Sequence, residues 1–281
     1  MTARPTSVAR RDAANAILAS SPGHHLPASG AAWFVALCLA LAAACAAASS
    51  SSPALVPFAL ALGPAAIAFG LAWRERTGAL RRLLRAYTVR PASKRWYLVL
   101  FIPILWALAV DVVAVVGGEV PAGLFDTITP AAVAIPLVVL LPAFAEEIAW
   151  RGFALPRALA VLSPINASLL LAVPWALMHL VLQLPGGINA TVSPWPTILS
   201  VLAYSVLLSW VYLGTGGSVL MSALVHTGLN GVVPLMWGVN AEAAWEIRAV
   251  LAAVIALAVV ARSRRPGTPL SARSHQIGGI A

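Results

Sequence analysis

Charged side chains are scarce in this sequence. Only 10% of its 281 residues are Asp, Glu, Lys or Arg, whereas 60% are hydrophobic. A soluble domain carries about 25% charged residues. No segment outside the apolar runs is long enough to build a hydrophobic core of its own. The composition therefore excludes a chain of several soluble domains and predicts an integral membrane protein.

Cysteine is nearly absent, since Cys38 and Cys45 are the only two and both lie in the first apolar run. Seven residues apart on one helix, their Cα atoms would be roughly 10 Å from each other. A disulfide cannot bridge that distance. We therefore expect no disulfide, and we interpret both residues as small apolar side chains in lipid or in a helix interface.

Several local motifs are also missing. The sequence contains no internal repeat, no glycine-rich phosphate loop, no CxxC pair and no HExxH. Without HExxH, a zinc peptidase lacks its strongest local signature. Without an inverted repeat, a transporter has no support from the sequence.

Apolar runs are what the sequence has in abundance. Most reach the roughly 20 residues that a helix needs to cross the hydrocarbon layer. The first could also be interpreted as a signal sequence, but its length and its long leader favour a span. The fold class predicted is therefore all-α, a polytopic transmembrane bundle of about eight spans. The runs are about 31–48, 54–73, 96–117, 131–154, 164–182, 196–213, 218–238 and 244–261.

The polar ends complete the predicted organisation. Residues 1–30 are expected to form a disordered cytoplasmic tail, and 262–281 a basic cytoplasmic tail. Between them, 31–261 is the transmembrane domain, with 131–238 as its catalytic core.

Positive charge is distributed unevenly along the chain. With a cytoplasmic N-terminus, seventeen of the eighteen basic residues fall on or near the inner side, and Arg248 is the exception. Positively charged loops stay in the cytoplasm, so both termini are predicted to be cytoplasmic in the cell membrane. The net charge of +9 is thus interpreted as a topology signal that also contacts anionic lipid headgroups. It does not indicate a nucleic-acid site. The preference for Arg over Lys and the abundant Ala are typical of a GC-rich bacterial genome.

The segment GALRRLLRAYTV, residues 78–89, has leucines at helical spacing with arginines between them. This pattern predicts a short amphipathic helix at the membrane interface. A lipid-anchoring connection explains it better than a specific partner site.

The stretch FAEEIAWRGFALP, residues 144–156, places charges inside an apolar run. Ionisable groups within spans are costly and are functional candidates. Glu147 and Arg151 are four residues apart, so they share a helix face in the favourable order for an ion pair. Glu146 is rotated by about 100° and faces elsewhere. We therefore expect Arg151 to hold Glu147 ionised, and Glu146 to be free to act as a general base.

Other intramembrane polar groups lie on later runs. His179 is in the fifth, whereas His226 and Asn230 share one face of the seventh. Asp111 lies near the outer end of the third run and is a weaker candidate. Prolines interrupt these runs and predict kinked helices around a wet cavity; they are Pro136, Pro142, Pro174 and Pro234.

These residue types permit two chemistries. A glutamate and a histidine can orient a water and take its proton, while a second histidine and an asparagine donate to the resulting oxyanion. Alternatively, Glu146, His179 and His226 could be three ligands of a catalytic zinc ion with an open fourth position. Both remain open from the residues alone.

The three motifs together resemble a known family. EEIAWR matches EExxxR of the CPBP family, the CAAX protease and bacteriocin-processing (Abi) family. WALMH matches FxxxH with Trp175 in place of Phe, and HTGLN matches HxxxN. They occur in the family's order on separate runs, over about 131–238. The earlier segment ALGPAAIAF and the Arg-rich loop after it also resemble the family's front half.

The resemblance implies an all-helical intramembrane endopeptidase whose partners are the lipid bilayer and a peptide or membrane-anchored protein substrate. Eukaryotic members trim the last three residues from prenylated CaaX proteins on the cytosolic side, and bacterial members are tied to bacteriocin maturation or immunity. Members are commonly labelled metalloproteases, although structural arguments favour a metal-free mechanism.

The family pattern also assigns roles to the residues. Glu146 would activate water with His179, and Glu147 and Arg151 would support it. His226 and Asn230 would stabilise the oxyanion.

Two other functions fit a polar cluster in the membrane: a binding or immunity protein that grips a peptide without cutting it, and a proton-coupled transporter.

One geometric difficulty also remains. Glu146 and His226 lie about eight residues from their cytoplasmic ends, but His179 lies some fifteen residues into its run, a mismatch of roughly 10 Å. We expect either a tilted fifth span, or residues 157–168 running along the interface before they descend.

Overall fold

The computed structural model describes residues 28–75, 78–118, 140–231, 241–263 and 268–270. Every regular element in these residues is a helix. Two of them depart from α geometry: η1 is a 3-10 helix and η2 is a π-helix. The helices are α2 (Ala28–Ala48), α3 (Val56–Arg74), α4 (Ala79–Arg85), η1 (Lys94–Phe101), α5 (Ile102–Val116), a helix over 140–147, η2 (Ile148–Ala154), α7 (Leu155–Ala158), α8 (Pro164–Val181), α9 (Pro194–Gly214), α10 (Val219–Gly231) and α11 (Ala241–Ser263).

Six of the described helices are long and apolar enough to cross a membrane. They correspond to six of the eight apolar runs. The fourth run is described only from residue 140, and the seventh forms α10, a shorter apolar helix. The all-helical, multi-pass class is thus confirmed, while the count of eight spans and the orientation stay predictions. Most of both terminal tails lies outside the described residues, as do Glu119, Asp126, Pro136 and Pro234.

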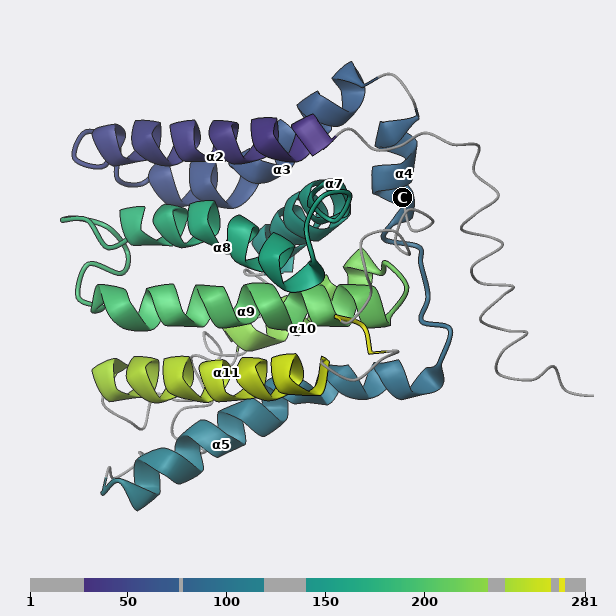
Figure 1. Ribbon diagram of the computed structural model, residues 1–281. Helices are drawn as coiled ribbons and strands as arrows, with labels where there is room; N and C mark the ends of the chain where they lie inside the picture. Colours follow the sequence, from purple (N-terminus) through teal and green to yellow (C-terminus); the bar gives the residue numbers. More distant parts are fainter. Residues whose placement is uncertain (1–27, 76–77, 119–139, 232–240, 264–267, 271–281) are drawn as a thin grey trace, which may run out of the picture.

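Helices α2, α8, α9, α11 and α5 follow one another from top to bottom in Figure 1, and α3 packs against α2. Helix α9 lies at the centre, packed between α8 and α11, and it is the most deeply buried of the candidate spans. Helix α10 packs against α9 and α5. The helix over 140–158 differs, because Figure 1 shows it nearly end-on and it therefore runs across the others.

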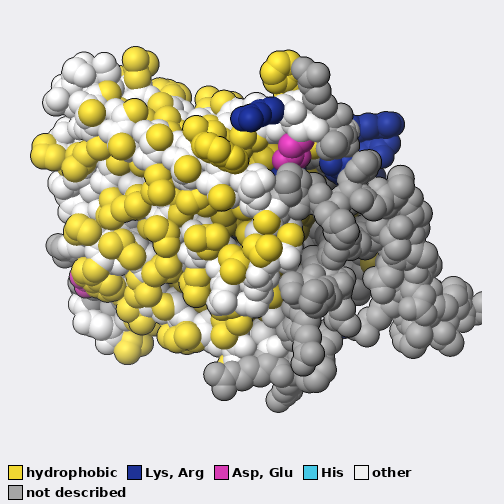
Figure 2. Space-filling view, turned by 45° about the horizontal axis from the view of Figure 1, so that its top comes forward, with side chains coloured by type: hydrophobic (Ala, Val, Ile, Leu, Met, Phe, Trp, Pro, Cys, Tyr) yellow, Lys and Arg dark blue, Asp and Glu magenta, His cyan; other side chains and the backbone are white. Residues whose placement is uncertain are grey.

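The outside of the bundle is apolar. Figure 2 shows one face covered by hydrophobic side chains, with Lys and Arg gathered at one end. Apolar patches of this extent are not found on soluble monomers and mark contact with lipid or a partner. The pattern matches a lipid-facing surface with a positively charged end. Its large exposed side chains include Trp33, Leu62, Leu105, Val112 and Leu257.

Proline marks where several helices begin. Pro164 and Pro194 stand at the starts of α8 and α9, where a missing N–H costs nothing. The hydroxyl of Ser163 also caps α8 by accepting from the backbone N–H of Asn166. Pro174 lies inside α8, which continues through it. Local chemistry therefore sets the entry point of the helix that carries His179.

The amphipathic segment forms α4, as its leucine spacing predicts. Leu83 is buried, whereas Leu80, Arg81, Leu84 and Arg85 are exposed. Helix α4 packs against η2. The segment is therefore a surface helix that covers the end of the bundle next to the glutamates.

Two further expectations can be compared with the structure. Cys38 and Cys45 are free and buried on one side of α2, as predicted. Arg248, the one basic residue assigned to the outer side, does not lie in a loop. It lies in α11, buried, with its Nη2 donating to the hydroxyl of Tyr204 and the carbonyl of Leu229 at 3.1 Å each. The aromatic hydroxyl and the backbone oxygen replace water as partners of the guanidinium.

Gly228 permits the close approach of α10 and α5. A Cβ atom at this position would lie 2.6 Å from Cγ of Pro103, and a proline ring cannot swing away. Gly228→Ala should therefore push the two helices apart and lower the free energy of unfolding by about 1–3 kcal/mol, measured in detergent micelles. Gly70→Ala in α3 is the control, because a Cβ there meets nothing within 4 Å. Equal stabilities of the two variants would contradict this account.

Candidate active site

The two glutamates end one helical segment and the π-helix η2 follows directly. A π-helix adds a residue to the turn and widens the backbone, and such segments occur frequently at functional sites. Gly152 in η2 lets α4 and α10 come near, because a Cβ there would lie 2.9 Å from Leu83 Cδ1 and 3.3 Å from Val219 Cγ2. The element bearing Arg151 is thus enclosed by its neighbours on both sides.

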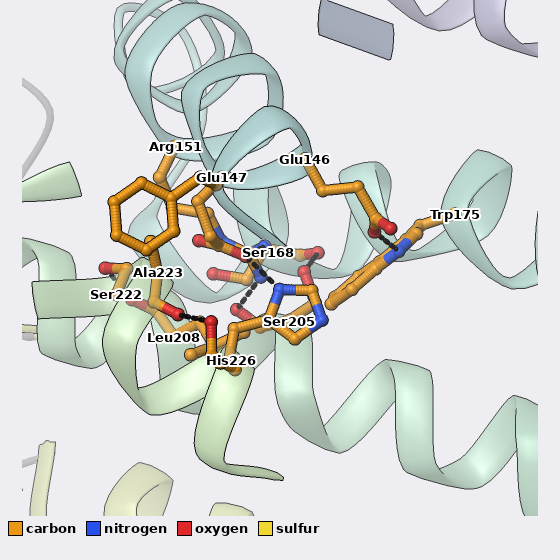
Figure 3. A network of polar contacts seen from close by, with 12 residues as sticks. Glu146, Glu147, Arg151, Ser168, Trp175, Ser205, Leu208, Ser222, Ala223 and His226 are labelled. Atoms are coloured by element: carbon orange, nitrogen blue, oxygen red, sulfur yellow. Dashed lines mark hydrogen bonds and ion pairs between the residues drawn. The ribbon is translucent and has the colours of Figure 1, made fainter. Parts of the chain in front are cut away.

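Glu146 and Glu147 leave the helix in different directions (Figure 3). Glu147 points toward His226, and Glu146 points toward Trp175. This is the divergence that a rotation of about 100° per residue predicts. The adjacent carboxylates consequently occupy two distinct environments.

Glu147 is the centre of a buried ionic cluster. Its Oε1 accepts from Arg151 Nη1 at 2.7 Å and lies 3.0 Å from His226 Nδ1. Glu147 is fully buried, and its Oε2 has no hydrogen-bond partner. Arg151 also donates to the carbonyl of Ser205 at 3.4 Å, and its guanidinium lies over the Trp175 ring, 4.8 Å from the centroid. The predicted Glu147–Arg151 pair is present, and His226 joins it.

Glu146 has a different partner. Its Oε2 accepts from the indole N–H of Trp175 at 2.7 Å. Glu146 retains 9% of its surface exposed, whereas Glu147 retains none. Glu146 is therefore the carboxylate that water can still approach.

His179 lies one turn beyond Trp175 on α8. Its Nδ1 is 3.0 Å from the backbone carbonyl of Trp175. A carbonyl oxygen can only accept, so Nδ1 carries a proton, and in the neutral ring Nε2 keeps a free lone pair. No hydrogen bond joins His179 directly to Glu146, and the Trp175 side chain contacts both. The edge-on rings of Trp175 and His179 are 5.8 Å apart.

Asn230 lies on α10, one turn after His226, and is half-buried. His226 packs edge-on against Trp175 with ring centroids 5.4 Å apart. Among the described residues, no hydrogen bond links Asn230 to the other predicted site residues. The structure thus brings five of the six around Trp175 and Glu147, with Asn230 beside them on the same helix as His226.

The depth mismatch expected from the sequence is resolved by the fourth run. Trp175 is the twelfth residue of α8, roughly 17 Å from its start, yet it contacts Glu146. The reason is that the helix over 140–158 crosses the bundle (Figure 1). Residues 159–163 form only a short turn before α8 begins, and the expected course of 157–168 partly along the interface stays a prediction.

Sequence reasoning missed three contributors to the site. Trp175 entered the sequence analysis only as a replacement for Phe in the second motif, but it donates to Glu146. The hydroxyl of Tyr87 donates to the carbonyl of Phe144, and the two rings stack at 5.6 Å. Ser205 provides a carbonyl to Arg151. The tryptophan in place of Phe could have been noticed in the sequence, because its indole adds a hydrogen-bond donor. The carbonyls of Phe144 and Ser205 belong to the backbone and leave no signal in the sequence.

Tyr87 also reports on the electrostatics of the site. It lies outside the candidate spans, and burial, with a smaller contribution from the charge of Glu147, raises the pKa of its hydroxyl. The phenol therefore stays protonated near neutral pH and keeps its hydrogen bond to Phe144.

The candidate zinc ligands do not form a metal-binding group in this structure. Within the described residues, no three His, Cys, Asp or Glu side chains lie close enough together to hold a metal ion. One oxygen of Glu146 is directed at Trp175, and His226 is directed at Glu147 by its Nδ1. The donors therefore do not fit a zinc site as arranged, and we assign no catalytic step to a metal.

Arg151 is the residue on which the buried cluster most depends. Arg151→Met would leave Glu147 in a dry interior with His226 as its one remaining partner, and removing one member of a buried ion pair costs about 3–5 kcal/mol. We expect a loss of that size in the free energy of unfolding in micelles. Glu147→Gln/Arg151→Met should recover a large part of it, because the unpaired charge is gone.

Arg81→Met on the exposed face of α4 is the matched control, with an expected change within about 0.5 kcal/mol. If Glu147→Gln/Arg151→Met loses as much stability as Glu147→Gln and Arg151→Met added together, the two charges do not interact.

The site residues all lie within one match to a known protein family. Residues 128–232 match the family model described as Rce1-like, the type II CAAX prenyl endopeptidase Rce1-like family. The matched range contains all six predicted site residues and Trp175. No curated protein matches the chain.

Proposed function

Because residues 128–232 form a domain of the CPBP/CAAX protease family, we propose that this chain is an intramembrane endopeptidase. It hydrolyses a peptide bond of a membrane-associated protein or peptide. The observation that carries the proposal is the division of the adjacent carboxylates into a sealed, ion-paired Glu147 and a buried Glu146 that keeps 9% of its surface accessible and has no ion-pair partner among the described residues. A general base must be able to reach water, and a supporting acid need not.

In the proposed reaction, Glu146 takes a proton from a water molecule through Oε1, the oxygen that Trp175 leaves free. The water is held by the lone pair of His179 Nε2. Its oxygen attacks the carbonyl carbon of the scissile bond, and the carbonyl electron pair moves onto its oxygen. The oxyanion electron pair then re-forms the carbonyl as the C–N bond breaks, and the protonated Glu146 gives its proton to the departing nitrogen, which releases a carboxylic acid and an amine.

His226 and Asn230 are proposed to stabilise the oxyanion. With Nδ1 directed at Glu147, His226 donates from Nε2 only when the ring is protonated. The contact with Glu147 fixes the orientation of the ring through Nδ1.

The wider assignments rest on the charge distribution. We assign residues 31–261 to the transmembrane domain, 131–238 to its catalytic core, and the termini to the cytoplasmic side. The arginines of α4 lie on the helix that covers η2, so we infer that the site opens toward the cytoplasm. A site at this end receives a substrate whose lipid anchor lies in the inner leaflet.

The chemistry is tested by removing the base and the water-binding histidine. Glu146→Gln and His179→Ala should each lower kcat at least 10²-fold, with the full-length protein reconstituted in liposomes and a quenched fluorescent peptide ending in an S-farnesylated CaaX sequence as substrate. Asp111→Asn in α5 is the control, because it makes the same change within a span outside the site. Undiminished cleavage by both site variants would refute the mechanism. A substrate left intact by the folded wild-type protein would instead favour a binding protein.

Asn230 can be tested separately, since its loss leaves the ionic cluster intact. Asn230→Ala should lower kcat by about 10²–10³-fold with little change in KM, because the amide acts on charge that develops in the transition state. Leu224→Ala, on the exposed face of the same helix, should leave both parameters unchanged. An unaltered kcat for Asn230→Ala would remove this residue from the site.

A further inference from the structure

Trp175 lies at the centre of the site. It is 2% exposed, and its side chain contacts four of the proposed functional groups. The indole N–H donates to Glu146, and the ring faces the guanidinium of Arg151 and the edges of His179 and His226. No other side chain in the described residues is shown in contact with all four.

We propose that Trp175 is the positioning residue of this site: it directs one oxygen of Glu146 and one nitrogen of His179 toward the same water. This inference rests on the proposed hydrolytic function, which supplies the water and its target. It adds a residue, and a choice of reactive atoms, to that function.

The first part of the argument concerns Glu146. An indole N–H can only donate, and a carboxylate oxygen accepts it in a charge-assisted hydrogen bond that is stronger than a neutral one. The contact of 2.7 Å is made by Oε2. Oε2 is thereby occupied and the plane of the carboxylate is fixed, so Oε1 is the oxygen left to take a proton.

The second part concerns His179, four residues further along α8. The backbone carbonyl of Trp175 binds Nδ1 of this histidine and thus leaves Nε2 as the acceptor. Side chain and main chain of one residue therefore set the orientation of the base and the tautomer of its partner. Because both groups are fixed from the same residue, a shift of Trp175 would misplace them together.

Trp150 shows that burial alone does not explain the hydrogen bond. It is also buried, at 1% exposure, and its ring lies 6.0 Å from that of Trp175. Its Nε1, however, has no hydrogen-bond partner. The two tryptophans share an environment and differ in whether the indole N–H is used, so they form a matched pair for mutation.

The test compares Trp175→Phe with Trp150→Phe in the full-length protein, using the S-farnesylated CaaX peptide. Trp175→Phe should lower kcat about 10- to 100-fold with KM within about twofold, because an oriented base is lost and substrate contacts are kept. The shape of its pH–rate profile should also change, because the Glu146 carboxylate loses the donor that directs it. Trp150→Phe should change neither.

The charged and titratable groups around Glu146 and Trp175 are the same in both variants. Glu147 and Arg151 follow Glu146 along the chain, His179 on α8 and His226 on α10 contact Trp175, and Tyr87 donates to the carbonyl of Phe144. A difference between the two pH–rate profiles can therefore be attributed to the indole N–H. Identical profiles and identical kcat values would overturn the proposal.

A second measurement is independent of activity and of the stability of Trp175→Phe. In protein labelled with ¹⁵N at its indole nitrogens, one of the ten tryptophan signals should shift as Glu146 ionises. Glu146→Gln should abolish that pH dependence. If the wild-type protein cleaves no peptide but this signal responds to Glu146→Gln, the hydrolytic function fails and the contact stands. If no indole signal responds, the positioning role of Trp175 is refuted even in an active protease.

Discussion

The rest of the site depends on one constraint, which is the neutralisation of a carboxylate inside an apolar bundle. Glu147 has no access to water, and a buried charge persists only when it is paired. Arg151 supplies the pair from the next turn, and His226 adds a donor from α10. The cluster thus connects a helix that crosses the bundle to one near its centre, and the same contact that neutralises Glu147 orients a histidine of the proposed site.

The direction of the helix over 140–158 determines which residues the two glutamates can reach. Because the helix over 140–158 does not run alongside α8, Glu146 reaches a residue roughly 17 Å along that helix. The π-helix that follows carries Arg151 in a widened turn. Glycine at position 152 lets α4 and α10 close over it. The positions of Glu146 and Glu147 are therefore set by the backbone of their own helix. Their partners Trp175 and His226 are brought to them by helix packing.

The sequence predicted the parts of this arrangement that follow from periodicity and hydropathy. Helical class, the Glu147–Arg151 pair and the divergence of Glu146 all follow from spacing along one chain. The fourth run was predicted only as a span, because hydropathy gives the length of an apolar segment and not its direction. Likewise, the pairing of His226 with Glu147 joins residues 79 apart in sequence. No local pattern encodes such a contact, and it follows only from how α10 packs.

Trp175 shows why a substitution within a motif can carry information that the motif does not. A phenylalanine would fill the same space and could face the same guanidinium, but it has no N–H to donate. Trp150 is buried beside Trp175, and its own indole N–H has no hydrogen-bond partner. This environment therefore tolerates an unused donor. The hydrogen bond to Glu146 is therefore not forced by burial of the indole. It depends on the carboxylate being directed there, and so Trp175 and Glu146 act as one unit.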